Sequence, residues 1–379
     1  GELLLCRQPL RLSVREVDAF RLCTAGDQTR SVAQSRPKPE RIVEKPPNKR
    51  LRAWWTDDPA DPGRLSLSSP CAQALIREMS PASRPTDLGG VMSLNVHLGD
   101  LGSVLRIHQP FVSRARLLGL HAVRAALLKR GLRVPVPQKW RDRVLLRCGR
   151  RWAEMEEYIP HRRLKPTTAS YQWLFGALGR LHRALSRVDL RIPRPCVATY
   201  AAPGSLHRWL AITARAVETT PECEPLISQL RTLIRGLDRL WVPASQLPVQ
   251  YIHGDARLSN IVQTGAEEPV YLDFGFLAQR PRIFDIAYAL VFMAWALQAG
   301  QSPEQVDWAL VPDLLDRYEE SSGSRLSRLE RRALLPMMVS VPLYAAALDG
   351  FTEDPAGKLM GRRSFIAFGA WLLAHPEIV

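Results

Sequence analysis

The chain has 379 residues, of which 46% are hydrophobic and 23% charged, which is ordinary for a globular protein with a sizeable core. Its formal net charge is +15, but no block of five like charges and no aromatic-studded basic segment indicates nucleic-acid binding. The six scattered cysteines form no Cys-x-x-Cys pair, and no apolar run has the length of a membrane span, which argues against zinc, disulfide and membrane-spanning proteins. We therefore expect a cytoplasmic protein with neither a membrane nor a nucleic-acid partner.

The first 82 residues differ from the rest of the chain. Stretches such as "SRPKPERIVEKPPNKR" and "DDPADPGRLSLSSP" are rich in proline, serine and mixed charge, without a sustained period of 2 or 3.6. Such a segment buries too little apolar surface to offset its ordering entropy. We therefore expect residues 1–82 to be a disordered or non-native extension. We also expect residues 1–78 to be dispensable, with translation starting at Met79.

Residues 83–157 predict a small β-rich domain. "GGVMSLNVHLG" and "GSVLRIH" read as two strands joined by a Gly-Asp turn. "RARLLGLHAVRAALLKRG" has apolar residues at helical spacing and ends at Gly131. "DRVLLRCGRRWAEMEEYIP" predicts two further strands around Gly149.

Residues 158–379 predict a larger and mainly helical domain. An exception is the block 248–276, where the short strands "VQYI" and "VYLDF" flank a polar loop. The predicted helices are Thr167–Leu185, Leu226–Leu240, Phe284–Leu297, Pro303–Glu320, Ser327–Leu348 and Lys358–Leu373. The fold class is therefore α+β with two lobes, and a cleft between two lobes is a favoured place for a ligand.

The polar loop carries the residue types that phosphoryl transfer from ATP needs. In "VQYIHGDARLSNIV", Asp255 supplies a carboxylate that can accept the proton of a hydroxyl, and Arg257 can reach the transferred phosphoryl group. Asn260 supplies an amide oxygen, and Asp273 in "VYLDFGF" supplies a second carboxylate, both suited to Mg²⁺. The sequence thus indicates a catalytic pair, Asp255 and Arg257, and a metal pair, Asn260 and Asp273.

The order and spacing of "HGDARLSN" and "LDFG" resemble the aminoglycoside phosphotransferase and choline kinase family, the small-molecule branch of the protein-kinase-like fold. "FDIAYAL", with Asp285, is similar to the third motif of this family, and the resemblance extends over about residues 86 to 375. It implies a five-stranded N-lobe, a helical C-lobe, and ATP with Mg²⁺ between them, acting on a small-molecule hydroxyl. His253 and Asp285 are expected as structural support, with Asp285 either capping its helix or bracing the loop.

The resemblance is looser in the N-lobe. Gly89 and Gly90 stand where a glycine-rich loop covers the phosphates, although a plain β-turn explains them as well. "SVLR" places Arg106 at the position of the ATP-pairing lysine, with a solvated strand arginine as the alternative. The segment "EMEEYIP" resembles the hinge, so backbone groups near Glu157 and Ile159 are expected to meet adenine.

Two features leave alternatives open. The helix after Arg106 usually carries a glutamate partner, yet residues 113–131 contain no Asp or Glu; His121 or a distant residue is a candidate replacement. This keeps open a nucleotide-binding pseudokinase or scaffold without turnover, and the net charge keeps open a salt-sensitive nucleic-acid binder. For a cationic substrate, candidate carboxylates in "LDGFTEDP" are Asp349, Glu353 and Asp354, with a solvated acidic turn as the alternative.

Overall fold

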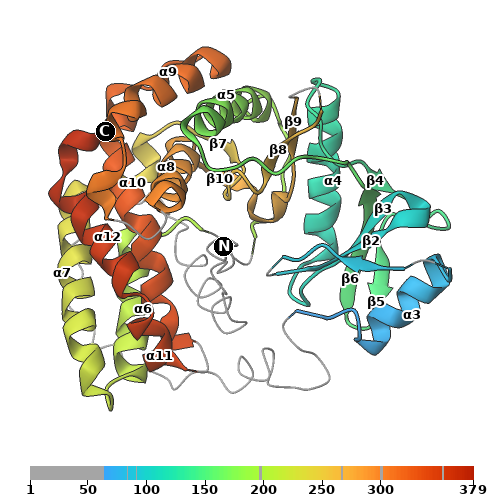
Figure 1. Ribbon diagram of the computed structural model, residues 1–379, viewed down its shortest axis with the longest axis horizontal. Coiled ribbons are helices and arrows are strands. Elements are labelled where there is room, and N and C mark those ends of the chain that lie inside the picture. Colours follow the sequence, from blue (N-terminus) through green and yellow to red (C-terminus); the bar gives the residue numbers. More distant parts are fainter. Residues whose placement is uncertain are drawn as a thin grey trace, which may run out of the picture.

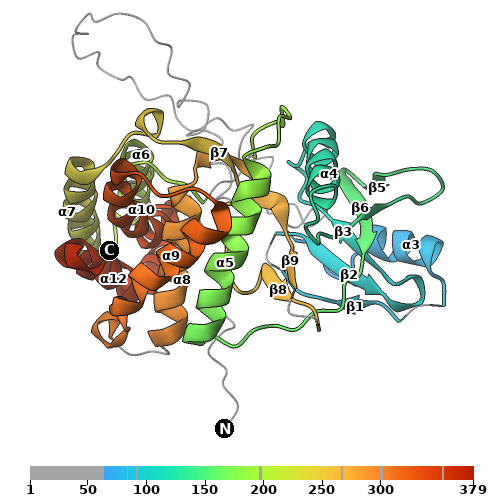
Figure 2. The same ribbon diagram turned by 90° about the horizontal axis from the view of Figure 1, so that it is seen from above.

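The computed structural model describes residues 64–82, 84–90, 92–195, 199–265, 268–298, 302–351 and 354–379. These residues form two lobes, a sheet-containing lobe with α3 and α4 and a helical lobe with α5 to α12 (Figure 1). The short strands β8 and β9 lie between the two lobes in both views (Figure 2). The predicted α+β bilobal fold is confirmed.

A six-stranded antiparallel sheet forms the N-lobe within the described residues, in the order β1-β2-β3-β6-β4, with β5 also paired to β6. The resemblance implied five strands. The strands are β1 Thr86–Asp87, β2 Leu94–Leu98, β3 Ser103–Ile107, β4 Pro137–Gln138, β5 Leu146–Cys148 and β6 Arg151–Glu157. The predicted hairpin is β2 and β3, and the predicted helix is α4, Arg114–Leu128, which begins at the N-cap Ser113.

The two faces of this sheet differ in chemistry because side chains alternate along each strand. One face is apolar and includes Leu94, Leu105 and Met155, which pack in one buried cluster with α3. The other face carries Arg106 and Glu154, which are register partners on β3 and β6. The polar face is therefore the one that is available to α4 and the C-lobe.

The N-terminal boundary of the folded chain was predicted wrongly. Helix α3, Pro70–Met79, belongs to the N-lobe and buries Ala72, Leu75, Ile76 and Met79. These positions have the i, i+3, i+4, i+7 spacing of an amphipathic helix, which the surrounding prolines and serines obscured. The predicted extension thus overlaps the fold, and Met79 is the end of a packed helix rather than the start of the ordered chain. Residues 1–63 of the predicted extension lie outside the described residues.

The C-lobe is built around α10, which packs against α8, α12, α6 and α7. A capping box between Ser327 and Glu330 starts α10, and Arg282 pairs with Glu330 at 2.7 Å. The helices are α5 Thr168–Leu185, α6 Pro203–Ala216, α7 Glu224–Leu240, α8 Ile283–Gln298, α9 Val311–Ser322, α10 Arg328–Ala347, α11 Pro355–Met360 and α12 Arg363–Ala374.

Most predicted C-lobe helices are confirmed, with three differences. The helix expected from Pro303 begins at Val311, after two short 3₁₀ turns. The helix expected from Lys358 is divided into α11 and α12 near Gly361. Helix α6 was not predicted, although its proline at N1 is a typical start signal. No described helix combines the length and apolar composition that crossing a membrane requires.

Four short strands carry the polar loop. Strand β7, Val249–Ile252, pairs with β10, Ala278–Pro281, and β8, Ile261–Gln263, pairs with β9, Pro269–Tyr271. β8 and β10 were not predicted. The loop with Asp255 joins β7 to β8, and the turn with Asp273 joins β9 to β10. The β8–β9 hairpin thus lies in the chain between the paired strands β7 and β10, and this arrangement brings the two polar stretches together.

Candidate active site

Asp255 is a buried carboxylate, with only 3% of the residue exposed. Its Oδ2 accepts a hydrogen bond from Asn260 Nδ2 at 2.7 Å, and its Oδ1 accepts one from the Tyr288 hydroxyl at 2.8 Å. Arg257 lies beside both oxygens, with Nε 3.0 Å from Oδ1 and Nη2 donating to Oδ2 at 3.1 Å. The guanidinium of Arg257 also lies over the ring of Phe292, at 5.3 Å from the ring centre.

Burial raises the pKa of Asp255, and Asp273 adds to that effect. Arg257, the Tyr288 hydroxyl and His253 favour the carboxylate, but they do not outweigh burial. A carboxylate with a raised pKa is a stronger base than an ordinary aspartate. The environment of Asp255 therefore suits the acceptance of a proton.

Asp285, at the start of α8, holds the loop between β7 and β8 by its backbone. Its Oδ2 accepts the His253 N–H at 2.7 Å, and its Oδ1 accepts the Gly254 N–H at 2.8 Å. Oδ2 is also 3.0 Å from Nε2 of the buried His182. Of the two roles expected for Asp285, these contacts are those of a brace.

His253 connects the loop after β7 to the stretch that follows β9. Its Nε2 donates to the carbonyl of Leu272 at 2.8 Å, and its Nδ1 accepts from the Asp255 N–H at 3.3 Å. Both ring nitrogens of this buried side chain therefore have hydrogen-bond partners. Since Leu272 directly precedes Asp273, His253 fixes the spacing between the two acidic stretches.

Gly254 is required by its surroundings. Its φ is +80°, and a Cβ at this position would lie 2.8 Å from the carbonyl oxygen of Phe276. Any side chain here would both strain the backbone and collide with the neighbouring turn. The glycine therefore permits the loop to approach the stretch that follows Asp273.

Asp273 has a left-handed backbone, with φ at +54°, and 40% of its side chain is exposed. Its Oδ1 lies 2.9 Å from Nη2 of Arg106 and accepts the Gly275 N–H at 3.3 Å. The surrounding protein acts to raise the pKa of Asp273, but Arg106, His253 and the Gly275 N–H outweigh this and lower it. Asp273 is therefore held as a partly accessible anion.

Arg106 is connected to the glycine turn through Asn95. Arg106 Nε donates to Asn95 Oδ1 at 2.9 Å, and Asn95 Nδ2 donates to the Gly89 carbonyl at 2.9 Å. Gly89 and Gly90 both have positive φ, +85° and +111°, in the turn between β1 and β2. The glycine turn, Arg106 and Asp273 thus form one hydrogen-bonded chain across the two lobes.

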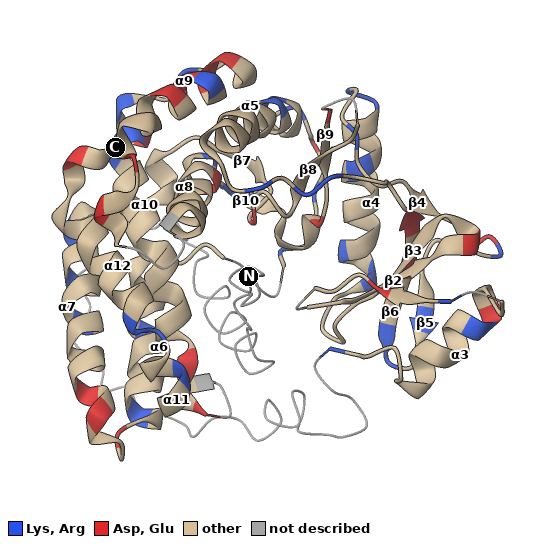
Figure 3. Cartoon of the chain, in the orientation of Figure 1, with Lys and Arg blue, Asp and Glu red and all other residues tan. Residues whose placement is uncertain are grey.

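Helix α4 lacks the glutamate that the resemblance led us to expect, and a glutamate on β6 meets basic residues of α4 instead. Glu154, on β6, lies beside Arg124 and His121 of α4 and accepts from His108 Nε2 at 2.9 Å. Burial alone would raise the pKa of Glu154, but Arg124 and the two histidines hold it well below its usual range. Figure 3 shows basic and no acidic residues along α4. The acidic partner is therefore on the strand and the basic partners are on the helix.

Arg116 ties α4 to the stretch after Asp273. This buried arginine donates from Nη2 to the carbonyls of Gly275 and Leu277, at 2.8 and 2.9 Å. Its Nη1 donates to the Pro193 carbonyl at 2.7 Å. Helix α4 consequently positions the Asp273 turn through main-chain contacts, whereas Arg106 contacts the Asp273 carboxylate.

The hinge residues lie where β6 leaves the N-lobe. The Glu157 N–H donates to the Val136 carbonyl at 2.9 Å, and the Glu157 side chain pairs with Arg133 at 2.5 Å. Ile159 is buried against Val262 and Val270 of the β8–β9 hairpin. These contacts place the predicted hinge directly against the strands that carry the polar loop.

The acidic stretch proposed for a cationic substrate has other partners. Asp349 is fully buried and 3.3 Å from Arg362, and burial raises its pKa to about 6 against the opposing effect of Arg362. Asp354 caps α11 by accepting the Gly357 N–H at 2.9 Å. Glu353 lies outside the described residues. Asp349 is thus neither a solvated turn residue nor free for a substrate.

The structure adds four functional candidates that sequence reasoning missed, namely Asn95, Arg116, Glu154 and Tyr288. Three of them, Asn95, Glu154 and Tyr288, could have been recognised from the sequence. An asparagine and a glutamate inside predicted strands are unusual, since strands disfavour both residues. Tyr288, three residues after Asp285, lies on the same face of α8, and helical spacing alone would have indicated it.

The donor atoms fit a Mg²⁺–nucleotide complex. Asn260 donates its Nδ2 to the Asp255 carbonyl and carboxylate, which leaves its Oδ1 contacted only by the Ser259 hydroxyl at 3.4 Å. The Asp273 carboxylate is the second oxygen donor. Within the described residues no group of three or more His, Cys, Asp or Glu residues forms a metal cluster. Magnesium usually binds through one or two protein oxygens plus phosphates, which this pair matches.

The model of the phosphotransferase enzyme family matches residues 87–321, which include Asp255, Asn260, Asp273 and Asp285. No curated protein matches the sequence.

Several solved structures share the fold at low sequence identity. The microcompartment-associated aminopropanol kinase has a TM-score of 0.60 at 17% identity, covering 80% of this chain and 95% of that one. Amicoumacin kinase hAmiN, in complex with AMP-PNP, Ca²⁺ and Ami, has a TM-score of 0.57 at 14% identity, covering 78% and 92%. A choline/ethanolamine kinase family protein from Mesorhizobium loti has 0.52 at 17%, covering 81% and 95%.

Proposed function

We propose that this chain, which belongs to the phosphotransferase enzyme family, transfers the γ-phosphoryl group of ATP to a hydroxyl of a small molecule with Mg²⁺ as cofactor. The observation that carries the proposal is the placement of two carboxylates, Asp255 buried and held by Asn260 and Tyr288, and Asp273 partly exposed and paired with Arg106. Asp255 is buried and its pKa is raised, whereas Asp273 is held as an anion by Arg106. When the surroundings raise the pKa of one carboxylate and lower that of another, the first is suited to act as a base and the second to bind as an ionised ligand.

Asp255 acts on the acceptor. One of its oxygens accepts the proton of the substrate hydroxyl as the new O–P bond forms and the bond to the ADP oxygen breaks. Asn260 and Tyr288 hold the carboxylate in place, and Arg257 keeps a positive charge beside the phosphoryl group. His253 and Asp285 keep the loop at its distance from Asp273.

Asn260 and Asp273 are the oxygen donors for the metal ion, which supplies neutralisation of phosphate charge when it is bound. Arg106 binds the phosphates from the N-lobe, and the Gly89–Gly90 turn offers main-chain N–H groups to them. The backbone near Glu157 and Ile159 receives the adenine. A chain that only bound a nucleotide would not need Asp255, Asn260 and Asp273 together, so we favour turnover over a pseudokinase.

For the acceptor, we favour an alcohol that also carries an amino group. The similar structures include an aminopropanol kinase and a choline/ethanolamine kinase family protein. The partly buried ring of Phe292, which lies beside Arg257, offers apolar surface on α8 near Asp255.

The test is direct measurement of phosphoryl transfer. The full chain is incubated with Mg²⁺ and γ-labelled ATP, or GTP, against a panel of amino alcohols, aminoglycosides, macrolides, amino acids and sugars. We expect acceptor-dependent label transfer for at least one class. Tight Mg²⁺-dependent nucleotide binding without transfer to any acceptor would instead identify a pseudokinase.

A further inference from the structure

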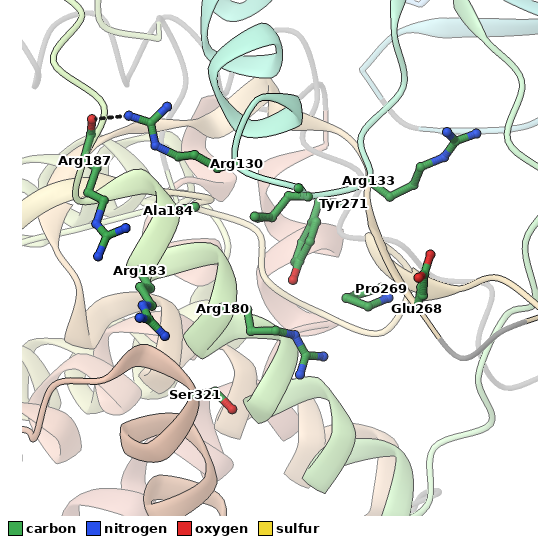
Figure 4. Close-up of a pocket in the computed structure, with 12 residues that line it drawn as sticks. Arg130, Arg133, Arg180, Arg183, Ala184, Arg187, Glu268, Pro269, Tyr271 and Ser321 are labelled. Atoms are coloured by element: carbon green, nitrogen blue, oxygen red, sulfur yellow. Dashed lines mark hydrogen bonds between the residues drawn. The ribbon is translucent and has the colours of Figure 1, made fainter.

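A second concave site, on the far side of the Arg133–Glu157 pair from the proposed nucleotide site, is lined by residues with no role assigned above. The cavity has a volume of about 420 Å³ and is formed by the segment after α4, the end of α5, strand β9 and the end of α9. Asp255, Asp273 and Arg106 are not among its lining residues. Figure 4 shows side chains from these separate elements drawn around one opening.

The lining is strongly and asymmetrically charged. Five arginines contribute to it, and Glu268 is its only carboxylate. The arginines are Arg130, Arg133, Arg180, Arg183 and Arg187. Positive charges gathered in a concave site repel one another, and low-dielectric walls concentrate their field. Such a lining is therefore poised for an anion.

Three of the five arginines already have partners. Arg130 donates to the carbonyls of Ala126 and Arg187, at 2.9 and 2.8 Å, and Arg133 pairs with Glu157. Arg180 is hydrogen-bonded to the hydroxyl of Tyr271. These contacts fix the rim of the cavity in position before any ligand is present.

The other two arginines are not paired in this way. Within the described part of the chain, the guanidinium groups of Arg183 and Arg187 make neither a hydrogen bond nor an ion pair. They are four residues apart at the end of α5 and line the same opening. A guanidinium binds phosphate by two parallel hydrogen bonds, so two such groups suit a ligand with more than one phosphate.

We propose that this cavity binds a compact polyanion, of the class of diphosphates and small metabolites bearing two phosphate groups. Its volume is in the range of small-molecule sites. A nucleic-acid strand is disfavoured because base stacking needs accessible aromatic rings, and the one aromatic residue in the lining, Tyr271, is fully buried.

A ligand in this cavity contacts residues of both lobes. Arg130 and Arg133 belong to the segment that leads from α4 to β4, whereas Arg183 and Arg187 belong to the C-lobe. A bound polyanion therefore joins the two lobes. The Tyr271 N–H also donates to the Arg133 carbonyl at 3.0 Å, two residues before Asp273, so the ligand stiffens the strand that leads to the metal-binding aspartate.

The test uses inorganic pyrophosphate as the probe, with binding to the full chain measured by calorimetry at constant, near-physiological ionic strength. The variant is Arg183→Ala/Arg187→Ala. The matched control is Arg235→Ala/Arg239→Ala, which removes the same charge at the same spacing from the exposed face of α7. Arg106→Ala reports on pyrophosphate bound at the nucleotide site.

We expect saturable binding that weakens at least about ten-fold in the α5 variant, since a hydrogen bond to a charged group has that effect or more. The α7 control and Arg106→Ala should retain this binding. Equal weakening in the α5 and α7 variants would show diffuse attraction to net charge and overturn the site. Loss in Arg106→Ala alone would place all of the pyrophosphate at the nucleotide site and would likewise overturn it. Unchanged circular dichroism and melting temperature establish that the variants fold.

Discussion

The loop of Asp255 and the turn of Asp273 use opposite physical means to set a carboxylate. Asp255 is buried, and the groups that contact its carboxylate all come from the C-lobe. Asp273 is 40% exposed along its side chain, and its charge partner, Arg106, comes from the N-lobe. Burial raises the pKa of the first, while a cation lowers that of the second.

This difference separates the two tasks of the site between the lobes. The base depends on the packing of one lobe, so it is complete without the other. The metal ligand depends on an ion pair between lobes, together with the Arg116 contacts from α4. Changes on the N-lobe side should therefore affect the nucleotide and metal, and changes around Asp255 should affect the transfer step.

The largest effect is expected for Asp255→Asn. The substitution keeps the shape of the side chain but removes its charge and basicity, and general-base contributions are about 10²–10⁴-fold. We expect kcat to fall by that factor while the affinity for the Mg²⁺–nucleotide complex is retained. A coupled assay with the identified acceptor and calorimetry with nucleotide provide the two readouts. Turnover like that of the wild type would contradict the assignment of the base.

Asp273→Ala should produce the complementary defect. Removing even an outer partner of a metal ligand typically costs about 10–100-fold in metal affinity, so losing a direct ligand should cost on the order of 100-fold or more. The loss should appear as weaker Mg²⁺-dependent nucleotide binding, measured by calorimetry across Mg²⁺ concentrations. Asn260→Ala should show a milder form of the same defect. Unchanged magnesium dependence in both variants would separate these residues from the metal.

Arg106→Ala should affect the nucleotide by about 10- to 100-fold in kcat/KM, because a charge-assisted hydrogen bond contributes about 1.5–3 kcal/mol. It also removes the cation that lowers the pKa of Asp273. The carboxyl of the variant will therefore be protonated more readily, so its magnesium affinity should begin to fall at a higher pH than that of the wild type. Parallel pH profiles of the two proteins would show that Arg106 does not set this carboxylate.

The smallest effect is expected for Tyr288→Phe, read from the pH profile of kcat. Asp255 works as the carboxylate, so the acid limb of the wild type should lie at higher pH than for an ordinary aspartate. The Tyr288 hydroxyl stabilises the carboxylate, and its removal should raise the pKa further and shift the acid limb upward again. A shift of the limb to lower pH would contradict the role given to this hydroxyl.

The sequence revealed the C-lobe part of the site more completely than the N-lobe part, for a physical reason. Asp255 and Asn260 are five residues apart and contact each other, so one local motif contains both, and Asp285 belongs to a second local motif. Arg106 and Asp273 meet only through the packing of two lobes, and Glu154 reaches α4 only through the register of β3 and β6. No local pattern contains such contacts.

The fold class followed from periodicity, and the errors arose where local signals conflicted with packing. Helix α3 has a clear amphipathic spacing, but the proline- and serine-rich neighbours suggested an extension. The helix expected from Pro303 to Glu320 was too long by two short 3₁₀ turns at its start, a difference that apolar spacing alone does not resolve.

Gly254 has a consequence for how this gene can vary. Every single-nucleotide change that converts a glycine codon into a codon for another amino acid adds at least a Cβ. At this position that atom would lie 2.8 Å from the Phe276 carbonyl oxygen, on a backbone with φ at +80°. Every missense change of this codon is therefore expected to disrupt the loop that carries Asp255, whereas silent changes leave the protein unaltered.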